Sequence, residues 1–317
     1  MPVHQFTGGK GSTPLPDPLH RGRPQVINRS IRTDTGQLLR GATMDIRKQA
    51  TPPCTRQAVW DHYRSLGLNL VRLGVKTDHD DAGRPLAQQL PFLDAAVDCA
   101  WNARMYVMIL VSINPGGYNL AQLTEFWTAV AARYAGRTHV LYEITNEPVS
   151  GGNYWGTTAH WTTAKLRDLR GVYDIMRTGA PDTHIMMFST PNLYPNAASW
   201  RAVPQQFEAL GSAIDWDKTS ISFHYYPGTY LFGDPNGFGG LQQLKDYGYC
   251  LFMSECNDFI GDPPSEDPRN SRQVWLWLEQ AEVSWACLDG KGGNVLTQIE
   301  PKILPYLAAN GRALPVE

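Results

Sequence analysis

The chain has 317 residues, of which 42% are hydrophobic and 18% charged, values typical of a globular protein with a sizeable core. The net charge is only −2 and no basic run occurs, which argues against nucleic acid as a partner. No apolar run approaches the roughly 20 residues that span a bilayer, which argues against a membrane protein.

Residues 1–24 contain several Gly and Pro residues and one Ser, a composition typical of a flexible arm. Met1 is not followed by a charged start and an apolar core, so the sequence predicts no signal peptide. A cytoplasmic protein and a trimmed secreted protein both fit this pattern. The segment 26–40 then predicts a short hairpin with Asp34-Thr35-Gly36 at its turn, placed to plug the bottom of a barrel.

Strand-like and helix-like segments alternate along the rest of the chain. The strand-like segments are 38–46, 68–75, 105–112, 139–146, 184–190, 220–224, 249–255 and 283–288. The helix-like segments are 56–65, 90–102, 120–134, 159–178, 197–210, 241–247, 272–279 and 301–309. This order predicts an α/β fold in which residues 25–317 form a single-domain (β/α)8, or TIM, barrel. The alternative is a doubly wound open sheet, but Gly41-Ala42-Thr43-Met44 lacks the glycine spacing of a dinucleotide-binding loop.

A glutamate lies at the end of one predicted strand and directly after another. Glu147 closes the segment 142–147 before Pro148, and Glu255 closes the segment 251–255. Glu255 follows Glu147 by 108 residues, which is three strand-helix units of about 36 residues each. Both carboxylates are therefore expected at the same rim of one barrel, and paired carboxylates across a cleft are the machinery of glycoside hydrolysis.

The two glutamates suit different roles in that reaction. Glu147 is the expected general acid, since Pro148 ends the strand and exposes the carboxyl group. Glu255 is the expected nucleophile, which has to be ionised and held still; retaining chemistry needs the two carboxyl groups about 5–5.5 Å apart. The chemistry requires no cofactor and no metal, and Asp78-His79-Asp80-Asp81 favours a solvated loop over a metal site.

Other residues at strand ends are candidates for substrate binding. Arg72, near the end of the second predicted barrel strand, can either hold the nucleophile as an anion or form a structural ion pair with Glu143. Asn146 can donate a hydrogen bond to a sugar hydroxyl beside the scissile bond. His224 and Tyr226 lie two positions apart at the end of a later strand and are expected to contact the acid, the nucleophile or the sugar.

Aromatic and cysteine residues give further expectations. With ten Trp and fourteen Tyr the chain is rich in rings on which sugars can stack, although most such rings belong to the core. Trp285 is expected to form the floor beneath the sugar, and loop aromatics such as Trp155, Trp161 and Tyr118 are candidates for outer platforms. The five cysteines favour free, buried thiols, with a Cys256–Cys287 bridge left open.

These motifs resemble glycoside hydrolase family 5, the cellulase-like retaining enzymes. The resemblance rests on the segments 69–72, 142–148, 224–226 and 254–255 together with Trp285, and runs through most of the chain. It implies Glu147 as the acid/base, Glu255 as the nucleophile, and Arg72, Asn146, His224, Tyr226 and Trp285 around the cleavage subsite.

Two positions depart from the family pattern. The family often has a histidine at the end of its third barrel strand, where this chain offers only Ser112 or Asn114. It often has a proline two positions after the arginine, where this chain has Gly74. These departures favour a divergent subfamily acting on a less familiar β-linked polysaccharide.

The sequence therefore predicts a monomeric retaining glycoside hydrolase that cleaves β-linked glycosidic bonds in a polysaccharide or oligosaccharide, such as an endo-β-glucanase. The alternatives are an exo-acting enzyme of the same family and a barrel that binds polysaccharide without cleaving it. A barrel lyase or aldolase is less favoured, because Lys76 lies just beyond a strand with no partner that would activate it.

Overall fold

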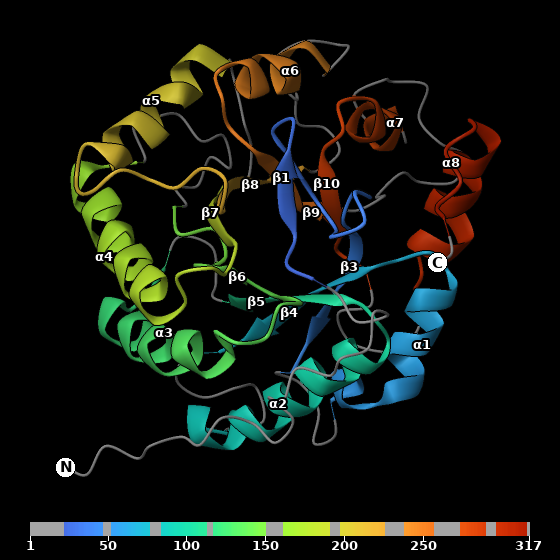
Figure 1. Ribbon diagram of the computed structural model, residues 1–317, viewed down its shortest axis with the longest axis horizontal. Coiled ribbons are helices and arrows are strands. Elements are labelled where there is room, and N and C mark those ends of the chain that lie inside the picture. The colour runs from blue at the N-terminus through green and yellow to red at the C-terminus, as the bar shows by residue number, and fades with distance from the viewer. Residues whose placement is uncertain are drawn as a thin grey trace.

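A computed structural model of the chain describes residues 22–46, 52–76, 84–112, 117–149, 161–190, 197–225, 238–256, 273–289 and 296–315. Eight parallel strands pair in chain order, and β8 also pairs with β9, so that the sheet closes into a barrel (Figure 1). The strands are β3 (Arg40–Asp45), β4 (Leu70–Val75), β5 (Tyr106–Val111), β6 (Val140–Glu143), β7 (Ile185–Thr190), β8 (Thr219–Tyr225), β9 (Leu251–Cys256) and β10 (Ser284–Cys287).

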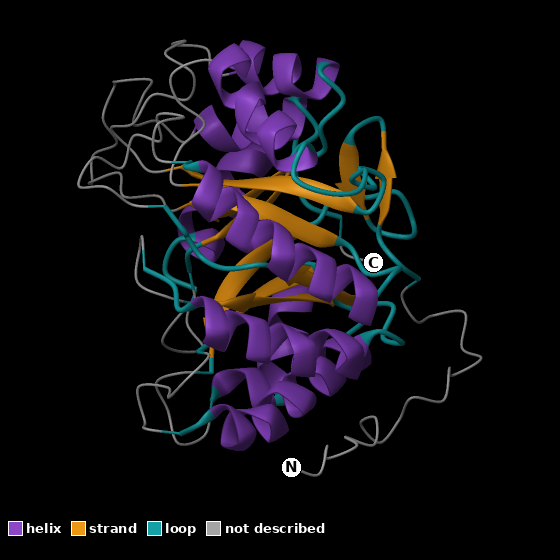
Figure 2. Cartoon of the chain, turned by 90° about the vertical axis from the view of Figure 1, so that its left-hand side faces the viewer, coloured by secondary structure: helices purple, strands orange, loops and turns teal. Residues whose placement is uncertain are grey.

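Helices follow the strands and form the outer layer, with the strands running through the middle of the side view (Figure 2). They are α1 (Gln57–Ser65), α2 (Leu86–Asn102), α3 (Leu120–Tyr134), α4 (Thr163–Gly179), α5 (Ala197–Glu208), α6 (Phe238–Asp246), α7 (Gln273–Gln280) and α8 (Leu304–Ala309). The predicted (β/α)8 barrel is confirmed, and each predicted segment overlaps one of these elements, with bounds that differ by up to a few residues. Among the described helices, none is long and apolar enough to cross a membrane.

The pleat of each strand divides its side chains between the helix layer and the barrel interior. On β4, for example, Val71, Leu73 and Val75 pack in the cluster between sheet and helices, whereas Leu70 belongs to the cluster inside the barrel. Arg72 and Gly74 share the inward face with Leu70. The interior is therefore apolar near the strand starts and becomes polar toward the strand ends, where the site lies.

A short hairpin precedes the barrel. Strands β1 (Gln25–Ile27) and β2 (Ser30–Arg32) pair antiparallel around Asn28 and Arg29, both of which have positive φ. The predicted turn at 34–36 is present, but it closes only an isolated bridge between Arg32 and Leu38, so the paired strands lie earlier than predicted.

The hairpin region closes the barrel at the end where the strands begin. Ile31 and Leu39 pack in the interior cluster with Leu70 and Tyr106. Leu70 is the first residue of β4 and Tyr106 is the first residue of β5. The Tyr106 hydroxyl donates to the carbonyl of Gly22, 2.9 Å away. The expected plug at the barrel bottom is confirmed. Most of the predicted arm, residues 1–21, lies outside the described residues.

All five cysteines are free and buried, and Cys256 and Cys287 are not bridged. The preference for free thiols is therefore confirmed. One of them, Cys250, belongs to a buried polar chain at the barrel bottom: the Ser220 hydroxyl is 2.7 Å from Nε2 of His184 and donates to Sγ of Cys250 at 3.0 Å.

His184 predicts a pH dependence of stability. Burial, assisted by the positive charge of Arg177, lowers the pKa of His184 to about 3. At a pH below the ordinary histidine pKa of about 6.5, His184 binds a proton in the unfolded chain but stays neutral in the folded protein. This difference lowers the free energy of unfolding progressively as pH falls toward 3. The free energy of unfolding is expected to lose about 1.4 kcal/mol per pH unit from this group in that range.

The measurement is urea unfolding between pH 4 and 6, for the parent chain and for His184→Gln. The glutamine keeps a polar group near Ser220 but cannot titrate, so the variant's stability should fall less steeply with decreasing pH. Equal slopes in the two proteins would contradict a neutral buried His184.

Candidate active site

Five polar side chains meet inside the barrel toward the strand ends. Arg72 lies on β4, Glu143 ends β6, His224 lies on β8 and Glu255 on β9, while Asn146 lies in the connection after β6. All but Asn146 are buried. Parallel strands bring their carboxyl ends to one rim of the barrel, which explains how residues so far apart in the chain come together.

Arg72 is the centre of this group. Its guanidinium donates from Nε to Oε2 of Glu143 (2.6 Å), from Nη1 to Oε2 of Glu255 (2.7 Å), and from Nη2 to Oδ1 of Asn146 (2.9 Å). The two roles that the sequence left open for Arg72 are therefore combined, since one guanidinium holds both Glu143 and Glu255. The guanidinium suits this position because its five N–H groups point outward in a fixed plane and can serve several acceptors at once.

The charges explain why Arg72 remains a cation in the interior. Burial alone would lower the pKa of Arg72, but the carboxylates of Glu143 and Glu255 outweigh that effect and raise the pKa above its ordinary value. The guanidinium in turn places its positive charge directly against both carboxylates. Removing the cation would leave two buried negative charges without compensation.

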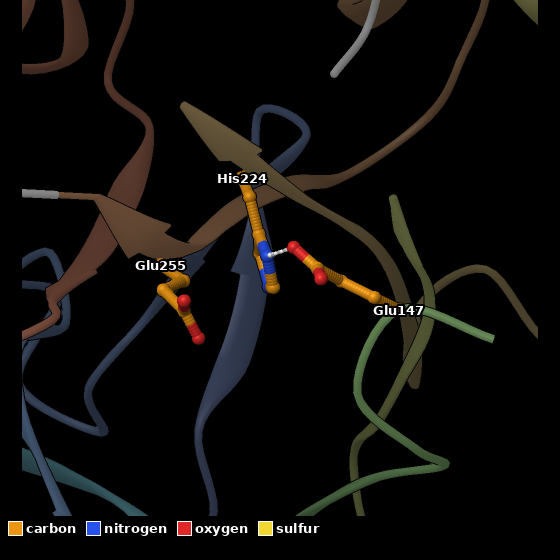
Figure 3. Close-up of side chains that lie close together, drawn as sticks. All are labelled: Glu147, His224 and Glu255. Atoms are coloured by element: carbon orange, nitrogen blue, oxygen red, sulfur yellow. Dashed lines mark hydrogen bonds and ion pairs between the residues drawn. The ribbon is translucent and has the colours of Figure 1, made fainter. Parts of the chain in front are cut away.

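His224 connects this group to Glu147. Nδ1 of His224 lies 2.7 Å from Oε1 of Glu147, and Nε2 lies 3.5 Å from Nη2 of Arg72. Because a guanidinium can only donate, Nε2 is assigned as an acceptor and the ring proton is assigned to Nδ1, which donates to Glu147. In Figure 3 the imidazole stands between the two glutamates, with its hydrogen bond directed to Glu147.

A β-bulge turns Glu255 into the barrel. Residues 222 and 223 pair with 252 and 253, but His224 pairs with Glu255, so β9 carries one extra residue, Ser254, at this point. Strict alternation from the inward-facing Phe252 would turn Glu255 toward the helices. The bulge shifts the pleat by one and places Glu255 beside Arg72.

The backbone at Glu147 is strained. Its φ is +37°, a left-handed value that is costly for any residue other than glycine. Its neighbour Asn146 is held by a hydrogen bond from its amide to the carbonyl of Val111 at 2.9 Å. This local geometry lies beyond the end of β6 at Glu143 and accompanies the approach of the Glu147 carboxyl to His224, 2.7 Å away.

The two candidate catalytic carboxyl groups are close. One carboxylate oxygen of Glu147, one of Glu255 and a ring nitrogen of His224 all lie within 4.8 Å of one another. Glu147 is 4% exposed and Glu255 7% exposed. The same three donors could coordinate a divalent cation, but the Arg72 guanidinium 2.7 Å from Glu255 opposes a second positive charge there.

With this geometry established, comparison with known proteins identifies the family. The sequence model of Cellulase (glycosyl hydrolase family 5) matches residues 33–286, which is most of the chain. The chain belongs to glycosyl hydrolase family 5.

The curated relatives that this chain matches are distant in sequence. Endoglucanase A of Butyrivibrio fibrisolvens is 25% identical over 222 residues, covering 67% of this chain and 46% of that protein. Endoglucanase A of Evansella cellulosilytica is 24% identical over 202 residues, covering 60% of this chain and 36% of that protein. This family 5 chain spans less than half the length of these two curated relatives.

Solved structures share the fold. A cellulase superposes with a TM-score of 0.64 at 19% identity, covering 85% of this chain and 81% of that chain. The catalytic domain of a Thermobifida fusca endoglucanase, solved in complex with cellotetraose, gives a TM-score of 0.61 at 18% identity, covering 84% of both chains. At this identity the likeness supports the barrel architecture of the family 5 chain.

The structure places Trp285 away from the site, which corrects the prediction of a sugar floor. Trp285 is fully buried in the cluster between sheet and helices, where its ring lies edge to face with Trp275, 4.9 Å between centroids. Its indole N–H donates to Glu279 of α7 at 2.9 Å. The pleat of β10 directs Ala286 inward and Trp285 outward, so this tryptophan supports helix packing.

The remaining predicted site residues either lie outside the described residues or are buried or partly buried. Tyr226, Trp155 and the segment 78–81 lie outside the described residues. Trp161 is buried and Tyr118 packs partly buried against the core, so neither forms the exposed platform that was expected.

One polar strand end was not recognised from the sequence. Asp45 ends β3 and is buried, facing the inward positions of β4 and β5. The signal was available, because Asp45 is an acidic residue at the end of its strand, as Glu255 is near the end of β9. It was overlooked because the predicted strand ran on through residue 46.

Proposed function

We propose that this family 5 protein is a retaining glycoside hydrolase that cleaves β-linked glucan chains, with Glu147 as general acid/base and Glu255 as nucleophile. The observation that carries the proposal is the approach of the two carboxylates to within 4.8 Å. Retaining enzymes hold their carboxyl groups about 5–5.5 Å apart, and inverting enzymes about 6.5–9.5 Å apart to admit a water. The separation favours retention.

In the first step Glu255 attacks the anomeric carbon while the bond to the leaving oxygen breaks. Glu147 gives its proton to that oxygen, so the leaving sugar departs as a neutral alcohol and Glu147 becomes a carboxylate. Because Oε1 of Glu147 accepts from His224, the transferred proton is assigned to Oε2. The product of this step is an ester between Glu255 and the sugar.

In the second step Glu147, now a base, removes a proton from a water molecule. The resulting hydroxide attacks the anomeric carbon and the ester bond to Glu255 breaks. Two inversions leave the released sugar with its original β configuration, and both carboxyl groups return to their starting protonation states.

The neighbouring residues support this division of roles. Arg72 contacts Glu255 and favours its anionic form, as a nucleophile requires. Arg72 also holds Oδ1 of Asn146, which directs the amide nitrogen of Asn146 away from Arg72, as a donor for a sugar hydroxyl. His224 fixes one oxygen of Glu147 and leaves the carboxyl group oriented for proton transfer.

The glucan substrate is inferred from the relatives. The curated relatives are named endoglucanases, and a related solved structure contains cellotetraose. An endo-acting β-glucanase is therefore the favoured form of the proposal, and an exo-acting enzyme on the same linkages is the alternative. A barrel that only binds polysaccharide would have no need for a strained Glu147 placed against Glu255.

The test is proton NMR of the products during the first minutes of hydrolysis of cellotetraose. The proposal expects the β anomer to appear first and the α anomer later, by mutarotation. First appearance of the α anomer would show inversion and contradict the assigned roles. A chromatographic product profile on a soluble β-glucan then separates endo from exo action.

A further inference from the structure

Three neighbouring strands form a polar corner beside the site, made by Asp45 at the end of β3, Gly74 on β4 and Ser112 just after β5. In register, Asp45 lies opposite Gly74, and Thr43, two residues earlier, lies opposite Arg72. Asp45 therefore occupies the layer of the barrel interior directly above Arg72, toward the open rim.

The absence of a side chain at Gly74 gives the Asp45 carboxylate its place. A Cβ added to Gly74 would lie 2.1 Å from Oδ1 of Asp45 and 3.3 Å from Cβ of Ser112. Any other residue at position 74 would therefore meet the carboxylate, which lies across the glycine and toward β5. Gly74 and Asp45 act as a pair, because the first makes room for the second.

The corner is continuous with the proposed catalytic residues. The Ser112 amide donates to the carbonyl of Val75 at 2.7 Å, and the Asn146 amide donates to the carbonyl of Val111 at 2.9 Å. Ser112 thus lies between the Asp45 carboxylate on one side and the Asn146–Glu147 segment on the other. Asp45 is 5% exposed, between the values for Glu147 and Glu255, so it is screened from solvent about as fully as those two carboxylates.

We propose that Asp45 is a specificity-determining residue that accepts hydrogen bonds from hydroxyl groups of the sugar bound at the barrel mouth beside Arg72. A carboxylate accepts through two oxygens, which suits two adjacent hydroxyls of a pyranose ring. A sugar that lacks one of these hydroxyls loses a hydrogen bond to a charged acceptor, so a carboxylate at this place favours the sugar that has the hydroxyl. The proposal rests on the glycosidase function and adds to it a residue that distinguishes sugars by their hydroxyl groups.

The test compares cellotetraose with its monodeoxy derivatives in four proteins: the parent chain, Asp45→Ala, Gly74→Ala and the double variant. The parent is expected to prefer cellotetraose over at least one monodeoxy derivative by about 10- to 100-fold in kcat/KM. Asp45→Ala should reduce that ratio to nearly 1. Gly74→Ala should do the same, because its methyl group displaces the carboxylate.

The double variant supplies the decisive comparison. If Gly74 acts through Asp45, adding Gly74→Ala to Asp45→Ala should change the ratio no further. Gly171→Ala on α4 is the matched control, since a Cβ there meets nothing within 4 Å and the ratio should stay at the parent value. An unchanged ratio in Asp45→Ala, with or without a lower Tm, would overturn the proposal and leave Asp45 a structural residue.

A binding measurement separates this inference from the proposed function. Calorimetric titration of Glu255→Gln, with and without Asp45→Ala, should show weaker binding of cellotetraose in the double variant and a loss of discrimination against the deoxy derivative. If the parent chain binds cellotetraose but cleaves no β-glucan, the proposed function fails, and the binding ratio still decides the role of Asp45.

Discussion

Replacing Glu255 with glycine is expected to lower kcat for hydrolysis of an aryl β-glucoside or β-cellobioside by about 10⁴-fold or more, because the attacking group is gone. Glycine also leaves a small space next to the anomeric carbon. Azide supplied in solution should occupy that space and attack in place of the carboxylate. The product should be the α-glycosyl azide, since only one inversion takes place.

Glu255→Gln is the control for this experiment. It removes the negative charge but fills the space, so it should remain inactive with azide. Glu282→Gly, at an exposed position remote from the site, should keep parental activity. Formation of a β-glycosyl azide by Glu255→Gly, or full activity of Glu255→Gln, would remove Glu255 from the role of nucleophile.

Replacing Glu147 with alanine should give an effect that depends on the leaving group. Hydrolysis of cellotetraose, whose leaving group must be protonated, is expected to fall by about 10²–10⁴-fold in kcat/KM. An aryl glycoside with a strongly acidic phenol needs little protonation and should lose much less in its first step. That step should leave the glycosyl ester on Glu255, which accumulates because no base activates water.

The reaction with azide distinguishes Glu147→Ala from Glu255→Gly. It should attack the accumulated ester and yield the β-glycosyl azide, the opposite anomer to that formed by Glu255→Gly. Equal losses for good and poor leaving groups would contradict the assignment of Glu147 as the acid. The two anomers together test the division of roles more strictly than loss of activity does.

The sequence predicted most of the fold because buried parallel strands are short apolar runs that cannot be confused with the amphipathic helices between them. It also predicted the rim position of Glu147 and Glu255, since both glutamates directly follow such runs. The approach of Arg72 to Glu255 could be expected because a buried carboxylate needs a cation. Each of these depends on position along a strand, which sequence specifies well.

The side of the strand on which a residue lies was harder to predict. In β10 the neighbours of Trp285 are small or apolar on both faces, so no alternation indicated that the ring points to the helices. Glu255 faces inward only because of the bulge at Ser254, which no turn residue marks in the sequence. The hairpin was displaced because Asn28 and Arg29 form its turn without the glycine that the segment 34–36 offers.

The central claim is tested most directly by trapping the covalent intermediate. A 2-deoxy-2-fluoro β-cellobioside with a good leaving group should glycosylate the enzyme and be released only slowly. The fluorine destabilises the positively charged transition states of both steps, and the good leaving group offsets this effect in the first step alone. Peptide mapping by mass spectrometry is predicted to find the sugar on Glu255, with Glu147 unmodified. A label on any other residue, or turnover without a label, would contradict the account.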